Sequence, residues 1–273
     1  MKRIGVAGFG ALVVSLALAS SAVAAEYPVT ALPQLGRCVF VGKLKGEWAG
    51  KYCQQLAPGK GSYEWKEGAE KKKFEGLNSE AVKLEPVGGK ASGRAIVCAG
   101  ATYNGEYTSA KAESVTLDLI GCELVSTKQK CQTSPAPQKE GEIEATLSGE
   151  VGFIKTGKAP TAGWDLKSWE VTVTCGQFPE TSIPVDKITG SVIAQVLKTG
   201  VMTKEETLKY REVGGKQIPE SFAGEPQDVL TSEFTQGLTK SKEQTGLKTI
   251  ILTESEEPLE IKVKCMEKKA QCK

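Results

Sequence analysis

The segment VTLDL (residues 115–119) alternates strictly between apolar and polar side chains, and the same alternation recurs in VTVTC (171–175) and LEIKVKC (259–265). Because successive side chains of a β-strand point to opposite faces, a period of two predicts strands with one buried face. Glycine or proline separates most of these segments, whereas amphipathic helical patterns are nearly absent. The sequence therefore predicts an all-β fold, either an antiparallel β-sandwich or a flattened barrel.

Shorter apolar segments predict the remaining strands of this fold. They lie near residues 37–42, 81–87, 93–99, 143–154, 190–197, 206–213 and 248–253. In TYNGEYT (102–108), Asn104-Gly105 lies between β-forming residues, which predicts a tight hairpin turn. The proline-containing stretch QTSPAPQKEGE (132–142) is either a linker that divides the chain or a long loop between strands.

The first 25 residues have the pattern of a secretory signal peptide. Lys2 and Arg3 precede an apolar run, and small residues close it at 22–25. We therefore expect a mature chain of residues 26–273, a single all-β domain unless it is subdivided near 132–142. No later segment is apolar enough to span a membrane, so we expect a secreted protein, extracellular or at the cell envelope.

Eight cysteines in an exported chain predict a disulfide framework. Pairing near neighbours gives Cys38–Cys53, Cys122–Cys131 and Cys265–Cys272, which leaves Cys98–Cys175 to join two strands. In the alternative, Cys98 and Cys175 are buried free thiols. The chain has no C-x-x-C pair and no histidine, which argues against zinc.

The absence of histidine also narrows the possible chemistry. It removes Ser-His and Cys-His nucleophiles and imidazole acid–base catalysis. The stretch GFIKTGKAP (152–160) resembles a phosphate loop, but Ala159 stands where a hydroxyl residue should bind magnesium. Losing Lys2 and Arg3 lowers the basic residues from 35 to 33, against 33 acidic ones. We therefore expect no cofactor, no metal and no nucleic-acid partner.

Aromatic residues are the remaining candidates for ligand contact. In KGSYEWKEGAEKKKFEG (60–76), nearly balanced charges surround Trp65, which favours a charged hairpin tip with its turn at 67–70 over a nucleic-acid surface. Trp164 and Trp169 could stack on sugar rings. Their spacing places them on opposite faces of a continuous strand, so we expect one in the core, unless Lys167-Ser168 interrupts the strand.

Several glycine-rich segments carry a resemblance to a known group of proteins. The segments are GRCVFVGK (36–43), GSYEWKEGAEKKKFEG (61–76), IVCAGATYNGEYT (96–108), LIGCEL (119–124), GEIEATLSGEVGFI (141–154), SFAGEPQDVLTSEF (221–234) and EEPLEIKV (256–263). Across residues 36–263 the chain resembles an expanded, uncharacterised family of secreted proteins in soil actinobacteria. The resemblance implies an exported β protein and carries no activity.

Two functional hypotheses follow from these observations. The first is a non-catalytic binding or structural module whose partner is a cell-envelope glycan or another protein. The second is a secreted glycoside hydrolase that uses a pair of glutamates on opposite sides of the scissile bond. A cleft that gathers two carboxylates and a tryptophan would favour the hydrolase.

Overall fold

The computed structural model describes residues 32–88, 93–135, 139–176, 185–236 and 238–264. These residues form strands and turns and contain no helix. None of the described residues, accordingly, belongs to a helix long and apolar enough to cross a membrane. The predicted signal peptide and the predicted Cys265–Cys272 bridge lie outside the described residues.

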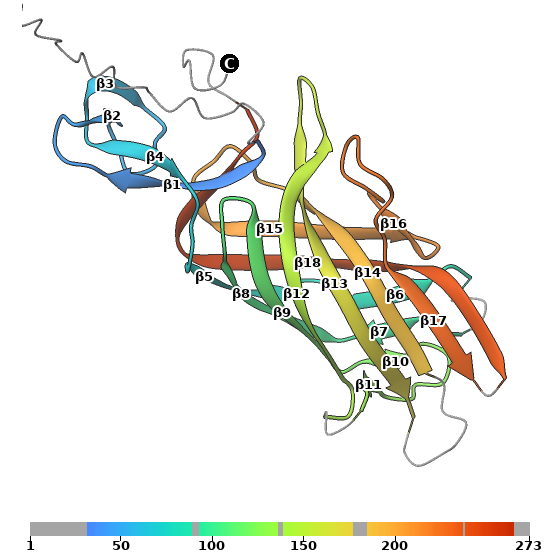
Figure 1. The fold of residues 1–273 in the computed structure, drawn as a ribbon. Helices are drawn as coiled ribbons and strands as arrows, with labels where there is room; N and C mark the ends of the chain where they lie inside the picture. Colours follow the sequence, from blue (N-terminus) through green and yellow to red (C-terminus); the bar gives the residue numbers. More distant parts are fainter. Residues whose placement is uncertain (1–31, 89–92, 136–138, 177–184, 237, 265–273) are drawn as a thin grey trace, which may run out of the picture.

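Eight strands close into an antiparallel barrel, which confirms the predicted fold class (Figure 1). Around the barrel they follow the order β5 (Lys73–Asn78), β8 (Gly100–Tyr107), β9 (Ala112–Ile120), β12 (Glu142–Lys155), β13 (Thr161–Cys175), β14 (Val185–Val196), β15 (Thr203–Val213) and β18 (Thr239–Lys262). Strand β18 closes the ring because it pairs with β15 along one edge and with β5 along the other.

Further strands extend the walls of the barrel at one end. The β14–β15 pairing is short, and β17 (Thr231–Gln236) instead bridges β14 and the first part of β18. On its other edge, β18 pairs with β6 (Val82–Pro86), which continues to β7 (Ile96–Cys98) and β10 (Glu123–Leu124). Short strand β11 (Cys131–Thr133) pairs with the end of β13, and short strand β16 (Lys216–Ile218) pairs with the end of β15.

A small N-terminal unit lies at the opposite end of the barrel (Figure 1). It consists of β1 (Gln34–Phe40), β2 (Gly46–Trp48), β3 (Leu56–Gly61) and β4 (Tyr63–Glu67). Strand β1 pairs with β4 and also with the last residues of β18, so one sheet runs from this unit onto the barrel.

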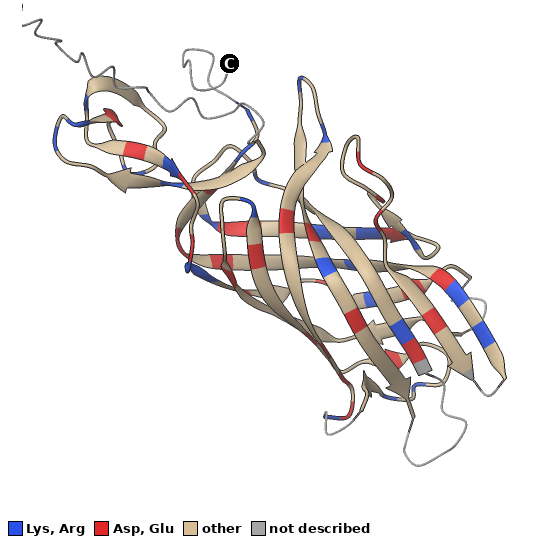
Figure 2. Ribbon diagram, viewed as in Figure 1, with Lys and Arg blue, Asp and Glu red and all other residues tan. Residues whose placement is uncertain are grey.

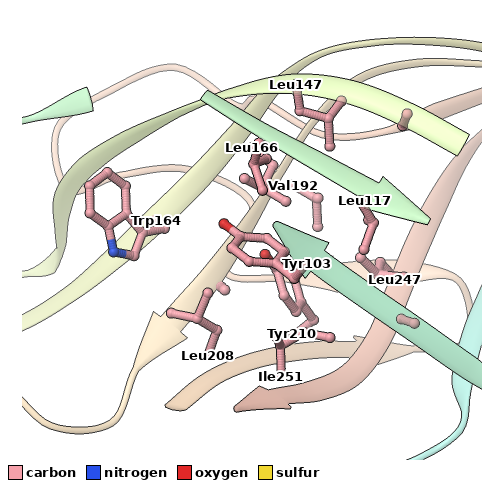
Figure 3. Packing of buried hydrophobic residues seen from close by; sticks show 14 of the residues in the cluster. Tyr103, Leu117, Leu147, Trp164, Leu166, Val192, Leu208, Tyr210, Leu247 and Ile251 are labelled. Carbon is pink, nitrogen blue, oxygen red and sulfur yellow. The ribbon is translucent and has the colours of Figure 1, made fainter. Parts of the chain in front are cut away.

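The core follows the alternation that the sequence predicted. In β9, Val115, Leu117 and Leu119 are buried, while the intervening side chains face outward. Figure 3 shows inward side chains from most of the barrel strands meeting in one cluster. Burial of each large apolar side chain stabilises the fold by about 1.5–3 kcal/mol, so this cluster supplies the main driving force for closing the barrel.

Three local predictions require correction or refinement. Asn104-Gly105 is not a hairpin turn, because β8 runs straight through it; a β-carbon at Gly105 would lie 2.2 Å from the Ser114 carbonyl oxygen. Strands β11 and β12, at the two ends of the 132–142 stretch, both pair with β13, so both belong to one barrel wall. Residues 68–72 form the predicted turn, but it connects the N-terminal unit to the barrel and does not close a hairpin.

The disulfide pairing differs from the expected one in the barrel. Cys38–Cys53 is confirmed. The structure then joins Cys98 to Cys122 and Cys131 to Cys175, in place of the predicted Cys98–Cys175 and Cys122–Cys131 bridges. The reason lies in the strand partners. Cys131 is directly opposite Cys175 in the β11–β13 pairing, and β7, which ends at Cys98, pairs with β10 immediately after Cys122.

Candidate functional site

A cleft of about 610 Å³ lies between the N-terminal unit and the adjacent end of the barrel. Three aromatic side chains from the N-terminal unit line it: Trp48, Tyr52 and Trp65. The barrel contributes the turn between β12 and β13, the connection from β14 to β15, and the end of β18 with Glu260 and Lys262. The cleft therefore combines flat apolar surfaces with one carboxylate and two ammonium groups, those of Lys262 and Lys264.

Contacts with strands β1 and β18 hold Trp65 in this cleft. It lies on β4 opposite Cys38 of β1, and a β-carbon at Gly36 would lie 2.1 Å from its Cζ2 atom. Glycine at position 36 thus lets the indole ring lie against the β1 backbone. From β18, the Lys262 ammonium lies 3.4 Å from the centre of the same ring, close enough for a cation–π interaction.

Burial perturbs both charged groups at the end of β18. It lowers the pKa of Lys262, an effect that the neighbouring Glu260 carboxylate opposes. Burial also raises the pKa of Glu260, which Lys262 and the Trp65 indole N–H partly offset. That N–H lies near the carboxylate but makes no hydrogen bond of good geometry. Both groups therefore have unused hydrogen-bonding capacity inside the cleft.

Tyr52 gives the cleft its accessible aromatic surface. Its side chain is 41% exposed, whereas Trp48 is only 5% exposed and forms part of the wall. The ammonium of Lys51 lies 5.1 Å from the centre of the Tyr52 ring. A ligand that enters the cleft can therefore contact Tyr52 without displacing packed core residues.

Trp164 and Trp169, two of the three predicted ligand-contact aromatics, lie in the barrel core and contribute nothing to the cleft. They are 0% and 2% exposed. The β13–β14 pairing shifts register between Leu166 and Trp169, and Ser168 has a positive φ of 67°. This irregularity changes the phase of the strand, so both indoles point inward. Of the three, only Trp65 lines the cleft.

The barrel interior also contains ionisable groups that the sequence analysis missed. Glu113 is 4% exposed, and the Tyr103 hydroxyl donates a hydrogen bond of 2.5 Å to its Oε1. Burial raises the pKa of Glu113 to about 8, helped by the charge of Glu206 and opposed by the Tyr103 hydrogen bond. Burial likewise raises the pKa of Glu206 to about 7. Glu206 is half-buried as a whole residue, but its carboxyl group is enclosed.

A sequence signal for these two carboxylates exists. Glu113 falls on the same phase as the buried residues of β9, and Glu206 on the same phase as Leu208 and Tyr210 of β15. Tyr103 and Tyr210 lie together in the core near Trp164 (Figure 3). A β-carbon at Gly149 would lie 2.3 Å from Glu113 Cγ, so glycine there leaves room for the Glu113 side chain.

The carboxylates that a hydrolase would use are distributed over different places. The aromatic cleft has two tryptophans with one glutamate among its lining residues. A groove of about 730 Å³ on the outer face of the barrel is lined by Glu75, Glu106, Glu254 and Glu256, and tryptophan is not among its lining residues. The barrel interior brings Glu113 and Glu206 near Trp164, but these groups are enclosed.

Comparison with known proteins adds no assignment to this geometry: no protein-family model, no curated protein and no solved structure matches the chain.

Proposed function

We propose that this protein is an exported, non-catalytic binding module and that the aromatic cleft between the N-terminal unit and the barrel binds a glycan. One observation carries the proposal. The cleft places Trp48, Tyr52 and Trp65 around a half-buried carboxylate and a half-buried ammonium. Its volume of about 610 Å³ lies within the range of about 300–1,000 Å³ that is usual for small-ligand sites.

The chemistry of the cleft suits a sugar. A pyranose ring has an apolar face of C–H groups that packs against an aromatic ring, and Tyr52 presents such a ring at the surface. Sugar hydroxyls can donate hydrogen bonds to Glu260 and accept them from Lys262. The three disulfides in the described residues are compatible with the exported location that the proposal requires.

Isothermal titration against soluble fragments of cell-wall polysaccharides tests the proposal. We expect saturable binding that Tyr52→Ala weakens about tenfold, a loss of about 1.4 kcal/mol. Phe40→Ala is the matched control, because Phe40 is an exposed aromatic residue of the same unit that lies outside the cleft. Binding that does not change in Tyr52→Ala would contradict the assignment of the cleft.

The same samples distinguish binding from hydrolysis. A non-catalytic module leaves the fragments intact, whereas a glycoside hydrolase releases new reducing ends. Release of reducing ends that stops on replacement of glutamates in the outer groove would overturn the proposal in favour of the hydrolase.

A further inference from the structure

Lys262 is a half-buried cation whose ammonium faces an aromatic ring. Its ammonium lies over the Trp65 ring, but no carboxylate of the described residues forms an ion pair with it. Glu260, two residues earlier on the same strand, is near enough to influence its charge without making that pair. Lys262 therefore keeps its hydrogen-bond donors available to a ligand.

Three lysines on the outer face of the barrel differ from Lys262. Cross-strand partners hold Lys167 to Glu150 at 2.6 Å, Lys187 to Glu170 at 3.0 Å and Lys242 to Glu233 at 2.6 Å. Figure 2 shows acidic and basic residues interspersed along these strands. Each of these three lysines has a cross-strand carboxylate partner, which Lys262 lacks.

Partial burial of the Lys262 ammonium costs free energy that its contact with the Trp65 ring offsets only in part. A cation–π contact is weaker than a charge-assisted hydrogen bond to a carboxylate, which is among the strongest pairings in proteins. Burial lowers the pKa of Lys262, which means that the surroundings disfavour the charged form of this side chain. An anionic group placed in the cleft would restore the missing partner.

The other charged residues of the cleft also favour a negatively charged ligand. Lys264 also lines it, and Lys51 lies beside Tyr52 at its rim. Against these cations, the lining residues include one carboxylate, Glu260. Glu260 is suited to accept hydrogen bonds from hydroxyl groups, which fixes the orientation of a sugar whose negative charge lies toward Lys262.

We infer that the cleft selects acidic glycans, meaning sugars that carry a carboxylate, and that Lys262 binds this carboxylate while the sugar ring packs against Tyr52. The inference deepens the proposed function and rests on it. It predicts that a neutral sugar of the same size and shape binds more weakly.

Two disaccharides that differ in one substituent test this inference. N-acetylglucosaminyl-N-acetylmuramic acid carries a lactyl carboxylate, and di-N-acetylchitobiose has the same sugar framework without it. By isothermal titration at low salt, we expect the acidic disaccharide to bind at least tenfold more tightly. Lys262→Met, which retains the apolar stem, should remove this preference. Lys248→Met, at an exposed lysine on the same strand outside the cleft, should retain it.

The outcomes separate the inference from the proposed function. Equal affinity for both disaccharides, weakened by Tyr52→Ala, overturns the acidic preference and leaves a glycan-binding cleft. A preference for the acidic disaccharide that persists in Lys262→Met overturns the role of Lys262. Absence of binding to either disaccharide overturns the inference, and the polysaccharide titration then decides whether the cleft binds glycans.

Discussion

Replacing Glu113 with glutamine should remove a pH-dependent instability from the barrel core. Glu113 enters the core from β9 and receives a hydrogen bond from Tyr103. Burial is the largest cause that raises its pKa from 4.5 to about 8. The folded protein therefore binds a proton at this site that the unfolded chain releases above pH 4.5. The stabilising contribution of the protonated group is complete below about pH 4.5 and is lost as the pH rises to about 8.

The size of this effect follows from the shift of the pKa. Each pKa unit corresponds to 1.36 kcal/mol, so the loss between the two pKa values is about 5 kcal/mol, of which about 3 kcal/mol is already lost at pH 7. Glutamine stays neutral and can still accept the hydrogen bond from the Tyr103 hydroxyl. We expect Glu113→Gln to match the wild-type protein near pH 4 and to be more stable by several kcal/mol at pH 8.5.

Urea unfolding followed by tryptophan fluorescence, with the disulfides intact, measures this difference at pH 4, 7 and 8.5. Glu144→Gln, at an exposed position on β12, is the matched control. Glu206 and Asp165, whose pKa values burial raises to about 7, give the variant a residual decline of stability with pH. Parallel curves for the wild-type protein and Glu113→Gln from pH 4 to 8.5 would refute the reasoning.

Two further predictions concern the disulfide bridges and the close approach of strands β8 and β9. Removing the Cys131–Cys175 bridge, which spans 44 residues, should lower the free energy of unfolding by about 4 kcal/mol. Removing Cys38–Cys53, which spans 15 residues, should lower the free energy of unfolding by about 3 kcal/mol. It should also weaken ligand binding, because Cys53 lines the cleft. Urea unfolding of the two double serine variants measures both losses of stability. Gly105→Ala should cost about 1–3 kcal/mol by the same assay, because its β-carbon would meet the backbone of β9.

Controls make these two predictions specific. A β-carbon at Gly100, on the same strand as Gly105, would meet Ile120 at an ordinary 3.7 Å, so Gly100→Ala should be far milder than Gly105→Ala. Equal losses in the two glycine variants would argue against the close approach of β8 and β9. For the disulfides, unchanged stability after loss of the 44-residue bridge would show that the unfolded chain gains little freedom.

The sequence predicted the strands because alternation is local, but it could not predict their partners. Residues 115–119 and 259–263 show their buried faces directly, since each face is defined by neighbours two positions apart. The disulfides depend on which distant strands pair, and alternation contains no information on that choice. Cys131 meets Cys175 only because β11 follows the edge of β13.

Local signals also failed where tertiary packing overrode them. Asn104-Gly105 has the composition of a hairpin turn, but glycine is needed there because β9 and the Phe74 ring approach the backbone closely. The aromatic cleft has no local signal at all. Its walls come from β2, the connection from β2 to β3, β4, two connections between barrel strands and the end of β18, so only the complete fold brings them together.

Exceptions to the alternation carry the functional information that the regular pattern lacks. A carboxylate on the apolar phase of a strand must be buried if its neighbours are, and Glu113 and Glu206 both occupy that phase. Burying such a group costs several kcal/mol, so it is tolerated only where the fold supplies protonation, a partner or space. For Glu113 the fold supplies all three through its raised pKa, Tyr103 and Gly149. Lys262 is not such an exception, because it lies on the polar phase of β18. It is recognised only in the structure, where its ammonium lies over the Trp65 ring without an ion pair among the described residues, and replacing it therefore tests the cleft directly.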